Sequence, residues 1–196
     1  LYSLEDNNKN LMETNEKLEN LISSTTQLIS IQQLKGNEQE SNLEYVKRIF
    51  RIALSLYDSF ELASCYIKVD DKPVFIDALG YDIDMINAID FSNHFHWALQ
   101  KPEHIVRPEN DLKERLGEDY KVYNNTIPEL KESIRFGIYI DELNCGGMSF
   151  DISRTSSKSF TKSDFDNFHS FQKLMNSLYE INYLNNKNIT LKNDIV

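Results

Sequence analysis

The stretch "SIRFGIYIDELNCGGMSFDISRT", residues 133–155, decides the fold. Its two runs, 133–143 and 146–155, are rich in β-branched and aromatic residues and are separated by a short polar segment. Apolar side chains in the first run alternate with others such as Arg135 and Tyr139. Because successive side chains of a strand point to opposite faces, one face is apolar and the other is mixed. We therefore expect a pair of long strands here.

A second pair of strands is predicted earlier in the chain, by "LASCYIKVD" (62–70) and "PVFIDALG" (73–80). Cys65 lies on the apolar face of the first run and Tyr66 on the mixed face. The short polar link between the runs and Gly80 after them are typical of a hairpin. Strands that cluster in pairs favour an antiparallel sheet in an α+β fold over a doubly wound parallel sheet.

Helices are predicted on both sides of these strands. Residues 42–60 carry apolar side chains at helical spacing and need a sheet to cover. The "TKSD" motif that begins at Thr161 predicts a capping box, in its Asp form, at the start of a closing helix that extends to about residue 194. Two long helices are thus available to bury the apolar face of the sheet.

The connector over residues 82–132 is less regular. We expect a short helix over 92–100 capped by Ser92, a short strand over 104–108 and a helix over 111–117. Its apolar residues need a surface to cover, and they are Met85, Ile86, Ile89, Phe91, Phe95, Trp97 and Leu99.

An apolar roof over a mixed sheet face has the composition of a ligand cleft. The candidate ligand-binding residues are Tyr66, His96, Trp97, Arg135, Tyr139, Ser149 and Asp151. Two alternatives stay open. The mixed face is simply solvated, as in many antiparallel sheets, or several of these side chains pair only with one another.

Composition narrows the functional classes. The net charge of −10 with scattered Lys and Arg argues against a nucleic-acid partner. Cys65 and Cys145 form no C-x-x-C pair, and His94 and His96 face different ways on a helix, so we expect no metal site and a cytoplasmic, reduced chain. No nucleotide-binding, hydrolase or metalloprotease motif is found, which predicts a protein that is not an enzyme.

A heptad pattern occupies the first 34 residues. Leucine recurs at d positions, while two consecutive a positions are Asn. A buried amide in a helix seam is satisfied only by the same amide of an in-register partner, so we expect a parallel homodimer. The predicted dimerisation residues are Leu4, Asn8, Leu11, Asn15, Leu18 and Ile22. The alternative is a lone amphipathic arm.

The closing strands and helix, "ESIRFGIYIDELNCGGMSFDISRTSSKSFTKSDFDNFHSFQKLMNSL", and the opening hairpin, "CYIKVDDKPVFIDALGYD", resemble a GAF domain. The resemblance covers about residues 41–184 and includes the F-T-x-x-D-x-x-x-F entry into the last helix. It implies a GAF/PAS-like sheet with the first and last helices on one face and a roofed small-molecule pocket on the other. The cyclic-nucleotide pattern of some members and the roof Cys of bilin-binding members are missing, so those ligands are not supported.

We therefore expect three parts: a coiled-coil signalling helix over 1–40, a GAF sensor domain over 41–184, and a helix over 185–196 that leads to an output domain outside this sequence. The resemblance implies a cytoplasmic ligand-sensing and dimerisation domain of a bacterial signal-transduction protein. Its output would be, for example, a cyclic-di-GMP enzyme or a histidine kinase, and its ligand is unidentified. The alternative is a GAF-like dimerisation module that binds no ligand.

Overall fold

The computed structural model describes residues 41–70, 72–89, 102–117, 127–139 and 145–193. The heptad segment and the predicted helix over 92–100 lie outside these residues. The elements, in chain order, are α2 (Asn42–Leu56), β1 (Leu62–Val69), β2 (Lys72–Leu79), α3 (Ile83–Asn87), β3 (Glu103–Val106), α4 (Asp111–Leu116), β4 (Leu130–Tyr139), β5 (Cys145–Ser153) and α6 (Lys162–Asn193).

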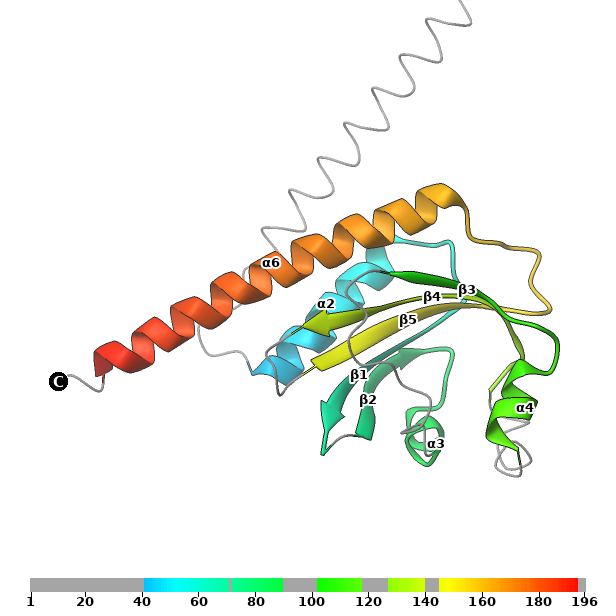
Figure 1. Ribbon diagram of the computed structural model, residues 1–196, viewed down its shortest axis with the longest axis horizontal. Helices are drawn as coiled ribbons and strands as arrows, with labels where there is room; N and C mark the ends of the chain where they lie inside the picture. The colour runs from blue at the N-terminus through cyan, green and yellow to red at the C-terminus, as the bar shows by residue number, and fades with distance from the viewer. Residues whose placement is uncertain (1–40, 71, 90–101, 118–126, 140–144, 194–196) are drawn as a thin grey trace, which may run out of the picture. The chain divides into compact units, whose positions relative to one another are not determined.

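The strands form one five-stranded sheet in the order β2-β1-β5-β4-β3, and every neighbouring pair is antiparallel. Figure 1 shows this open, twisted sheet with helices on both sides. β4 and β5 form the longest pair, from Leu130 opposite Ser153 to Tyr139 opposite Cys145. The predicted α+β class, both strand pairs and the short strand β3 are confirmed.

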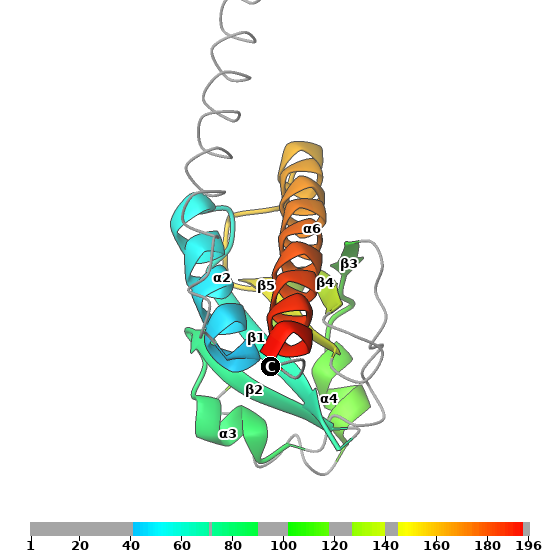
Figure 2. The ribbon, with the colours of Figure 1, turned by 90° about the vertical axis from the view of Figure 1, so that its left-hand side faces the viewer.

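α2 and α6 cover the apolar face of the sheet, which we call the helix face (Figure 2). Phe136 of β4, Phe150 of β5 and Phe168 of α6 are fully buried between the layers. The ring centroids of Phe150 and Phe168 are 4.5 Å apart. Burying a phenylalanine side chain contributes about 1.5–3 kcal/mol, so this cluster is a large share of the core. The prediction that the first and last helices cover the apolar face is confirmed.

α2 is shorter than predicted. Its N-terminus is capped by Ser41, whose hydroxyl accepts a hydrogen bond from the backbone N–H of Glu44 at 3.2 Å. It ends at Leu56 rather than at residue 60, because Tyr57 already has an extended backbone. The Tyr57 ring then packs 4.7 Å from that of Phe168, and burial raises its pKa to about 12. Aromatic packing against α6 therefore replaces the last predicted turn.

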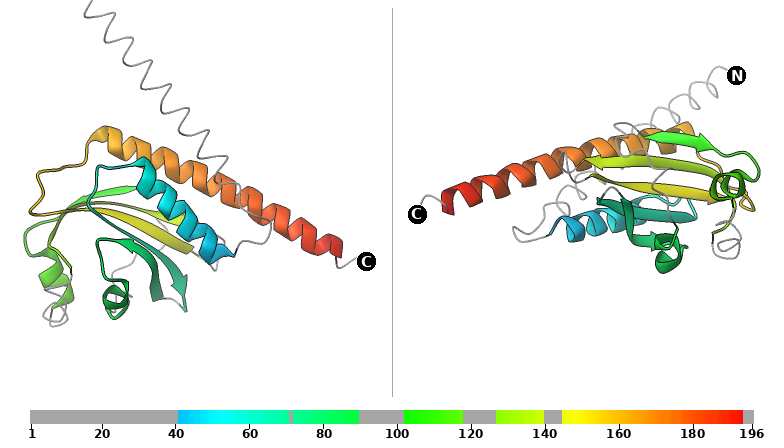
Figure 3. Two further views of the ribbon diagram at one scale, coloured as in Figure 1. Left: turned by 180° about the vertical axis from the view of Figure 1, so that it is seen from behind. Right: turned by 60° about the horizontal axis from the view of Figure 1, so that its bottom comes forward.

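α3 and α4 lie on the opposite side of the sheet, which we call the second face (Figure 3). The periodicity did not predict α3, whose N-terminus is capped by Asp82. The side-chain amide of Asn87 accepts from the backbone N–H of Phe75 at 2.8 Å and donates to its carbonyl at 2.9 Å, which holds α3 against β2. An apolar cluster fills the space between α3 and the sheet, and it consists of Tyr66, Phe75, Ile86, Ile89 and Ile127. Where α3 packs, the second face is therefore not simply solvated.

α6 runs without a break from Lys162 to Asn193, close to the predicted end. At its start, the Thr161 hydroxyl accepts from the N–H of Asp164 at 3.2 Å, and the Asp164 carboxylate accepts from the N–H of Thr161 at 2.7 Å. This confirms the predicted capping box. The helix continues past residue 184, where the GAF domain is predicted to end. That domain boundary stays a prediction. In the described part of the chain, no helix is long and apolar enough to cross a lipid bilayer.

Replacing Thr161 with Ala should destabilise the domain by about 1 kcal/mol, since the helix loses its capping hydroxyl. Urea denaturation followed by circular dichroism measures the change. Ser163→Ala, an exposed position in the first turn, is the matched control and should change stability by less than about 0.5 kcal/mol. Equal stability of Thr161→Ala and the native chain would contradict the role of the cap.

Candidate functional site

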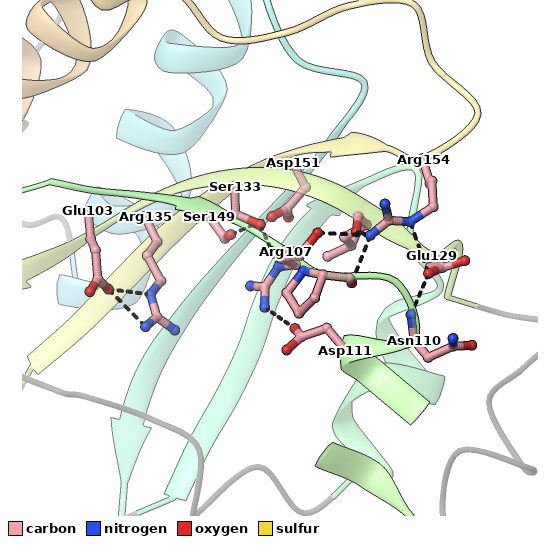
Figure 4. A network of polar contacts seen from close by, with 12 residues as sticks. Glu103, Arg107, Asn110, Asp111, Glu129, Ser133, Arg135, Ser149, Asp151 and Arg154 are labelled. Atoms are coloured by element: carbon pink, nitrogen blue, oxygen red, sulfur yellow. Dashed lines mark hydrogen bonds and ion pairs between the residues drawn. The ribbon is translucent and has the colours of Figure 1, made fainter. Parts of the chain in front are cut away.

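The register of the sheet brings polar residues together on the second face. Ser149 of β5 lies between Ser64 of β1 and Arg135 of β4, and Asp151 lies opposite Ser133. The structure therefore places the predicted residues Arg135, Ser149 and Asp151 on one face, as strand alternation indicates. Figure 4 shows these side chains together with Glu103 of β3, Arg107, and Asp111 of α4.

Asp151 is the centre of a buried hydrogen-bond network and is only 3% exposed. Its carboxylate accepts from the Ser149 hydroxyl at 2.8 Å and from the Tyr81 hydroxyl at 2.9 Å. Burial raises the pKa of Asp151, although hydrogen bonds from Ser133 and Ser149 and the charge of Arg107 act in the opposite direction. Burial, together with the nearby Asp151 charge, also raises the pKa of Tyr81 well above its usual value. The tyrosine therefore stays a donor to the carboxylate.

Arg107 extends this network to α4. Its Nε donates to the Ser133 hydroxyl at 3.1 Å and its Nη1 to the Asp111 carboxylate at 2.8 Å. Both side chains of the ion pair are largely buried. Breaking such a pair leaves an uncompensated buried charge, so the contact holds α4 over the second face.

Sequence reasoning missed Arg107, Asp111, Ser133 and Tyr81. The spacing of an Arg at the end of a short strand and an Asp four residues later was a local signal for the ion pair. For Ser133, the strand pattern was sufficient, because Ser133 shares its face with Arg135. Tyr81 carried no such signal, since it lies in the segment after the hairpin.

Arg135 makes a separate ion pair nearer the edge of the sheet. Its Nε and Nη2 donate to the same carboxylate oxygen of Glu103, at 3.0 and 2.8 Å. The Glu103 side chain is 47% exposed, and that of Arg135 is 19% exposed. Exposed pairs of this kind contribute about 0–1 kcal/mol, so the pair can be exchanged for another anion at little cost.

Tyr66 is placed differently from the other predicted residues. It is buried in the apolar cluster under α3, with its ring 5.7 Å from that of Phe75. Its phenol lies directly over Gly147, since a Cβ built on that glycine would be 2.5 Å from the Cζ atom of Tyr66. Tyr66 therefore packs on the floor of the second face.

The remaining predicted residues are not placed. Tyr139 ends β4, but its side chain lies outside the described part of the structure, as do His96 and Trp97. The structure thus brings Arg135, Ser149, Asp151 and Tyr66 to one face, and the roles of Tyr139, His96 and Trp97 stay predictions.

A third arginine, Arg154, holds the ends of the strands together beside this network. Nη2 of Arg154 donates to the backbone carbonyls of Arg107 and Pro108, at 2.9 and 2.8 Å, and its Nε lies 2.9 Å from a carboxylate oxygen of Glu129. The same Glu129 oxygen accepts from the N–H of Asn110 at 2.8 Å. These contacts fix the turn that leads from β3 into α4.

The arrangement offers hydrogen-bond donors and acceptors rather than a reactive centre. Burial raises the pKa of the Cys65 thiol well above its usual value, helped by the charge of Asp77 and opposed by Lys47, so the thiol is not activated as a nucleophile. Among the described residues, no group of three or more His, Cys, Asp or Glu side chains is arranged to hold a metal ion.

The sequence matches no protein-family model and no curated protein sequence. Solved structures are similar to it. The GAF domain of a protein described as a sensor histidine kinase from Pseudomonas syringae pv. tomato is 11% identical and has a TM-score of 0.56, with 90% of this chain and 97% of that domain covered. The chain has a GAF-like fold. At this identity the likeness concerns the fold alone, and it confirms the fold that the resemblance implied.

Two further neighbours have lower scores. One is a domain of a protein described as a two-component sensor histidine kinase from Sinorhizobium meliloti, 14% identical, with 72% of this GAF-like chain and 93% of that chain covered at a TM-score of 0.46. The other is the GAF domain of an Acinetobacter phosphoenolpyruvate-protein phosphotransferase, 7% identical, with coverages of 83% and 95% and a TM-score of 0.44.

The raised pKa of Asp151 predicts a specific pH dependence of stability. Between the pKa of the unfolded chain, about 3.9, and the higher pKa of the folded state, the folded protein binds more protons, so its stability falls as pH rises. Asp151→Asn should remove this slope, so the native chain should lose stability relative to the variant as pH rises above about 4, until the pH exceeds the pKa of the folded state. Urea denaturation at several pH values measures the difference.

Asp166→Asn, at an exposed position of α6, is the control substitution and should leave the slope unchanged. A difference between native chain and Asp151→Asn that stays constant with pH would show that the carboxyl has no raised pKa in the folded state.

Proposed function

We propose that this GAF-like domain is a sensory domain of a bacterial signal-transduction protein that binds a small molecule over the second face. The observation that carries the proposal is the composition of that face. It combines an apolar cluster under α3 with a buried polar network centred on Asp151. Ligand sites are mostly apolar with a few well-placed polar groups. The likeness to a GAF domain from a protein described as a sensor histidine kinase supports the same conclusion.

The ligand would contact the predicted residues Tyr66, Arg135, Tyr139, Ser149 and Asp151, with His96 and Trp97 supplied by the connector. Arg135 is the residue best suited to make a new contact. Its fork of donors is directed at one oxygen of Glu103, whose carboxylate is half exposed and is readily displaced by an anionic group of a ligand. Asp151 is fully engaged and would shape the floor of the site.

The signal would leave the domain through helices. α6 is continuous from Lys162 to Asn193 and would connect the domain to a C-terminal output domain, such as a cyclic-di-GMP enzyme or a histidine kinase. The heptads that contain Leu11 would pair in register in a parallel homodimer, where a rigid seam carries a rotation or a shift from one domain to the next. We place this protein in the cytoplasm, with no nucleic-acid partner.

A second candidate function is a GAF-like dimerisation module that binds no ligand. It is favoured by the pairing within the second face, where Asp151 bonds Ser149 and Tyr81, Arg107 bonds Asp111, and Arg135 bonds Glu103. A face whose polar groups already satisfy one another gains less from a ligand.

Native mass spectrometry of the freshly purified chain distinguishes the two functions. The sensor predicts a dimer that retains a small molecule, and the module predicts an empty dimer. Arg135→Ala should reduce the retained fraction at least tenfold without unfolding the domain, because the ligand loses its charged contact. Tyr139→Ala should also weaken retention.

Arg51→Ala is the matched control, since it also removes an arginine and one ion pair, with Asp77, outside the proposed site. Loss of the molecule in both arginine variants, or in neither, would refute the site assignment. An empty, strictly monomeric species would contradict the whole proposal.

The dimer has its own test. Leu11→Asp places a charge at a d position of the proposed seam and should raise the dissociation constant of the dimer at least tenfold, as measured by analytical ultracentrifugation. Asn10→Asp, which adds the same charge at an outward heptad position, should leave the dimer intact. Equal association of the two variants would show that the heptads do not form the seam.

A further inference from the structure

Two glycines face each other in the middle of the sheet. Gly137 of β4 is directly opposite Gly147 of β5, and both belong to the second face by alternation. Gly147 is also opposite Tyr66 of β1. At this point the sheet presents bare backbone on its second face, and the phenol of Tyr66 covers it.

The fit between Tyr66 and this backbone is close. A Cβ on Gly147 would collide with the phenol oxygen of Tyr66 and would be 3.0 Å from the carbonyl oxygen of Phe136. Any other residue would hold the ring away from the strands. The glycine therefore lets an aromatic side chain of the second face rest directly on the main chain of β5.

The helix face carries an unusual residue beside the same pair. Gln172 of α6 is only 1% exposed, and its side-chain amide donates to the backbone carbonyl of Gly137 at 2.9 Å. The residues around it on the helix, Phe168, Phe171 and Met175, are apolar and buried. A buried amide costs stability unless it is hydrogen-bonded, whereas Leu would pack there without this requirement. The amide instead ties the position of α6 to one carbonyl of β4.

The Gly137 carbonyl that accepts this hydrogen bond from Gln172 belongs to a part of β4 that lies beyond the pairing with β3. The pairing of β3 with β4 ends at Arg135, two positions before Gly137. Gln172 of α6 thus hydrogen-bonds to a part of β4 that no longer pairs with β3. A series of contacts therefore leads from Tyr66 on the second face, through the paired Gly147 and Gly137, to Gln172 of α6.

We propose that Tyr66, Gly147, Gly137 and Gln172 form a link through the sheet by which a displacement of Tyr66 shifts α6. This inference rests on the proposed sensory function, since it states how a ligand over the second face would reach the exit helix. A molecule that moves the Tyr66 ring changes the contact with Gly147, and the paired Gly137 carries the change to the amide of Gln172. Gln172 acts as a positioning residue, because the displacement would reach it through the main chain of β4 and β5 rather than from the ligand itself.

A double-mutant cycle on the full chain tests the link. Tyr66→Leu and Gln172→Leu are made singly and together, and the unfolding equilibrium constant of each variant is measured by urea denaturation. We expect the double variant to depart from additivity by at least about threefold in this constant. The control cycle pairs Tyr66→Leu with Met175→Leu, a buried neighbour of Gln172 on α6, and should be additive within about twofold. Additivity in both cycles overturns the proposal, and so does equal non-additivity in both.

A more conservative substitution tests the link if a leucine variant does not fold. Tyr66→Phe removes only the hydroxyl over Gly147, and the side-chain NH2 signals of Gln172 in a ¹H–¹⁵N spectrum report on its hydrogen bond. These signals should move in Tyr66→Phe, while those of the other glutamine side chains stay in place. Unmoved Gln172 signals overturn the link.

Neither measurement needs a ligand. The link and the sensory function can therefore be refuted independently of each other. An empty monomer in native mass spectrometry would refute the sensory function and leave the physical link standing. A retained molecule combined with an additive Tyr66–Gln172 cycle would refute the link alone.

Discussion

The rings of Phe150 and Phe168, with centroids 4.5 Å apart, join the sheet to α6. Phe136 and Phe60 extend this contact, so that two strands, the entry to β1 and the exit helix share one aromatic cluster. Aromatic pairs contribute about 0.5–1.5 kcal/mol beyond the burial of their surface. Because this packing closes the helix face, a helix can leave the domain while it remains attached to the centre of the sheet. The helix face of the domain depends on that attachment.

The second face is organised by different physical chemistry. There the sheet buries Asp151, Ser133 and Arg107, and a buried polar group is tolerated only when it is hydrogen-bonded. The bonds to Tyr81 and Asp111 meet this requirement and at the same time hold the segments after β2 and β3 in place. The polar network and the Asn87 contact with β2 thus position α3 and α4, which the apolar cluster alone would leave free to slide.

Side chains from both faces contact the main chain at Gly137 and Gly147, which have no side chains of their own. The opposed glycines of β4 and β5 let Tyr66 touch the main chain from one side, while Gln172 holds it from the other. A packed sheet is stiff, and a shift at one point is transmitted to the groups bonded there. In a GAF-like domain with a long exit helix, this geometry joins the surface that would receive a ligand to the element that would carry the signal away.

The sequence by itself determined the antiparallel sheet, its two faces, the helices that cover the apolar face and the capping box of α6, because these features depend on local periodicity and on residues a few positions apart. It also placed Arg135, Ser149 and Asp151 on one face. Only the tertiary structure decided their partners. Tyr81 lies 70 residues from Asp151 and Glu103 lies 32 residues from Arg135, and such pairs depend on the register between strands. α3 escaped prediction for the same reason, since this single turn is held by Asn87 bonding to the backbone of another element.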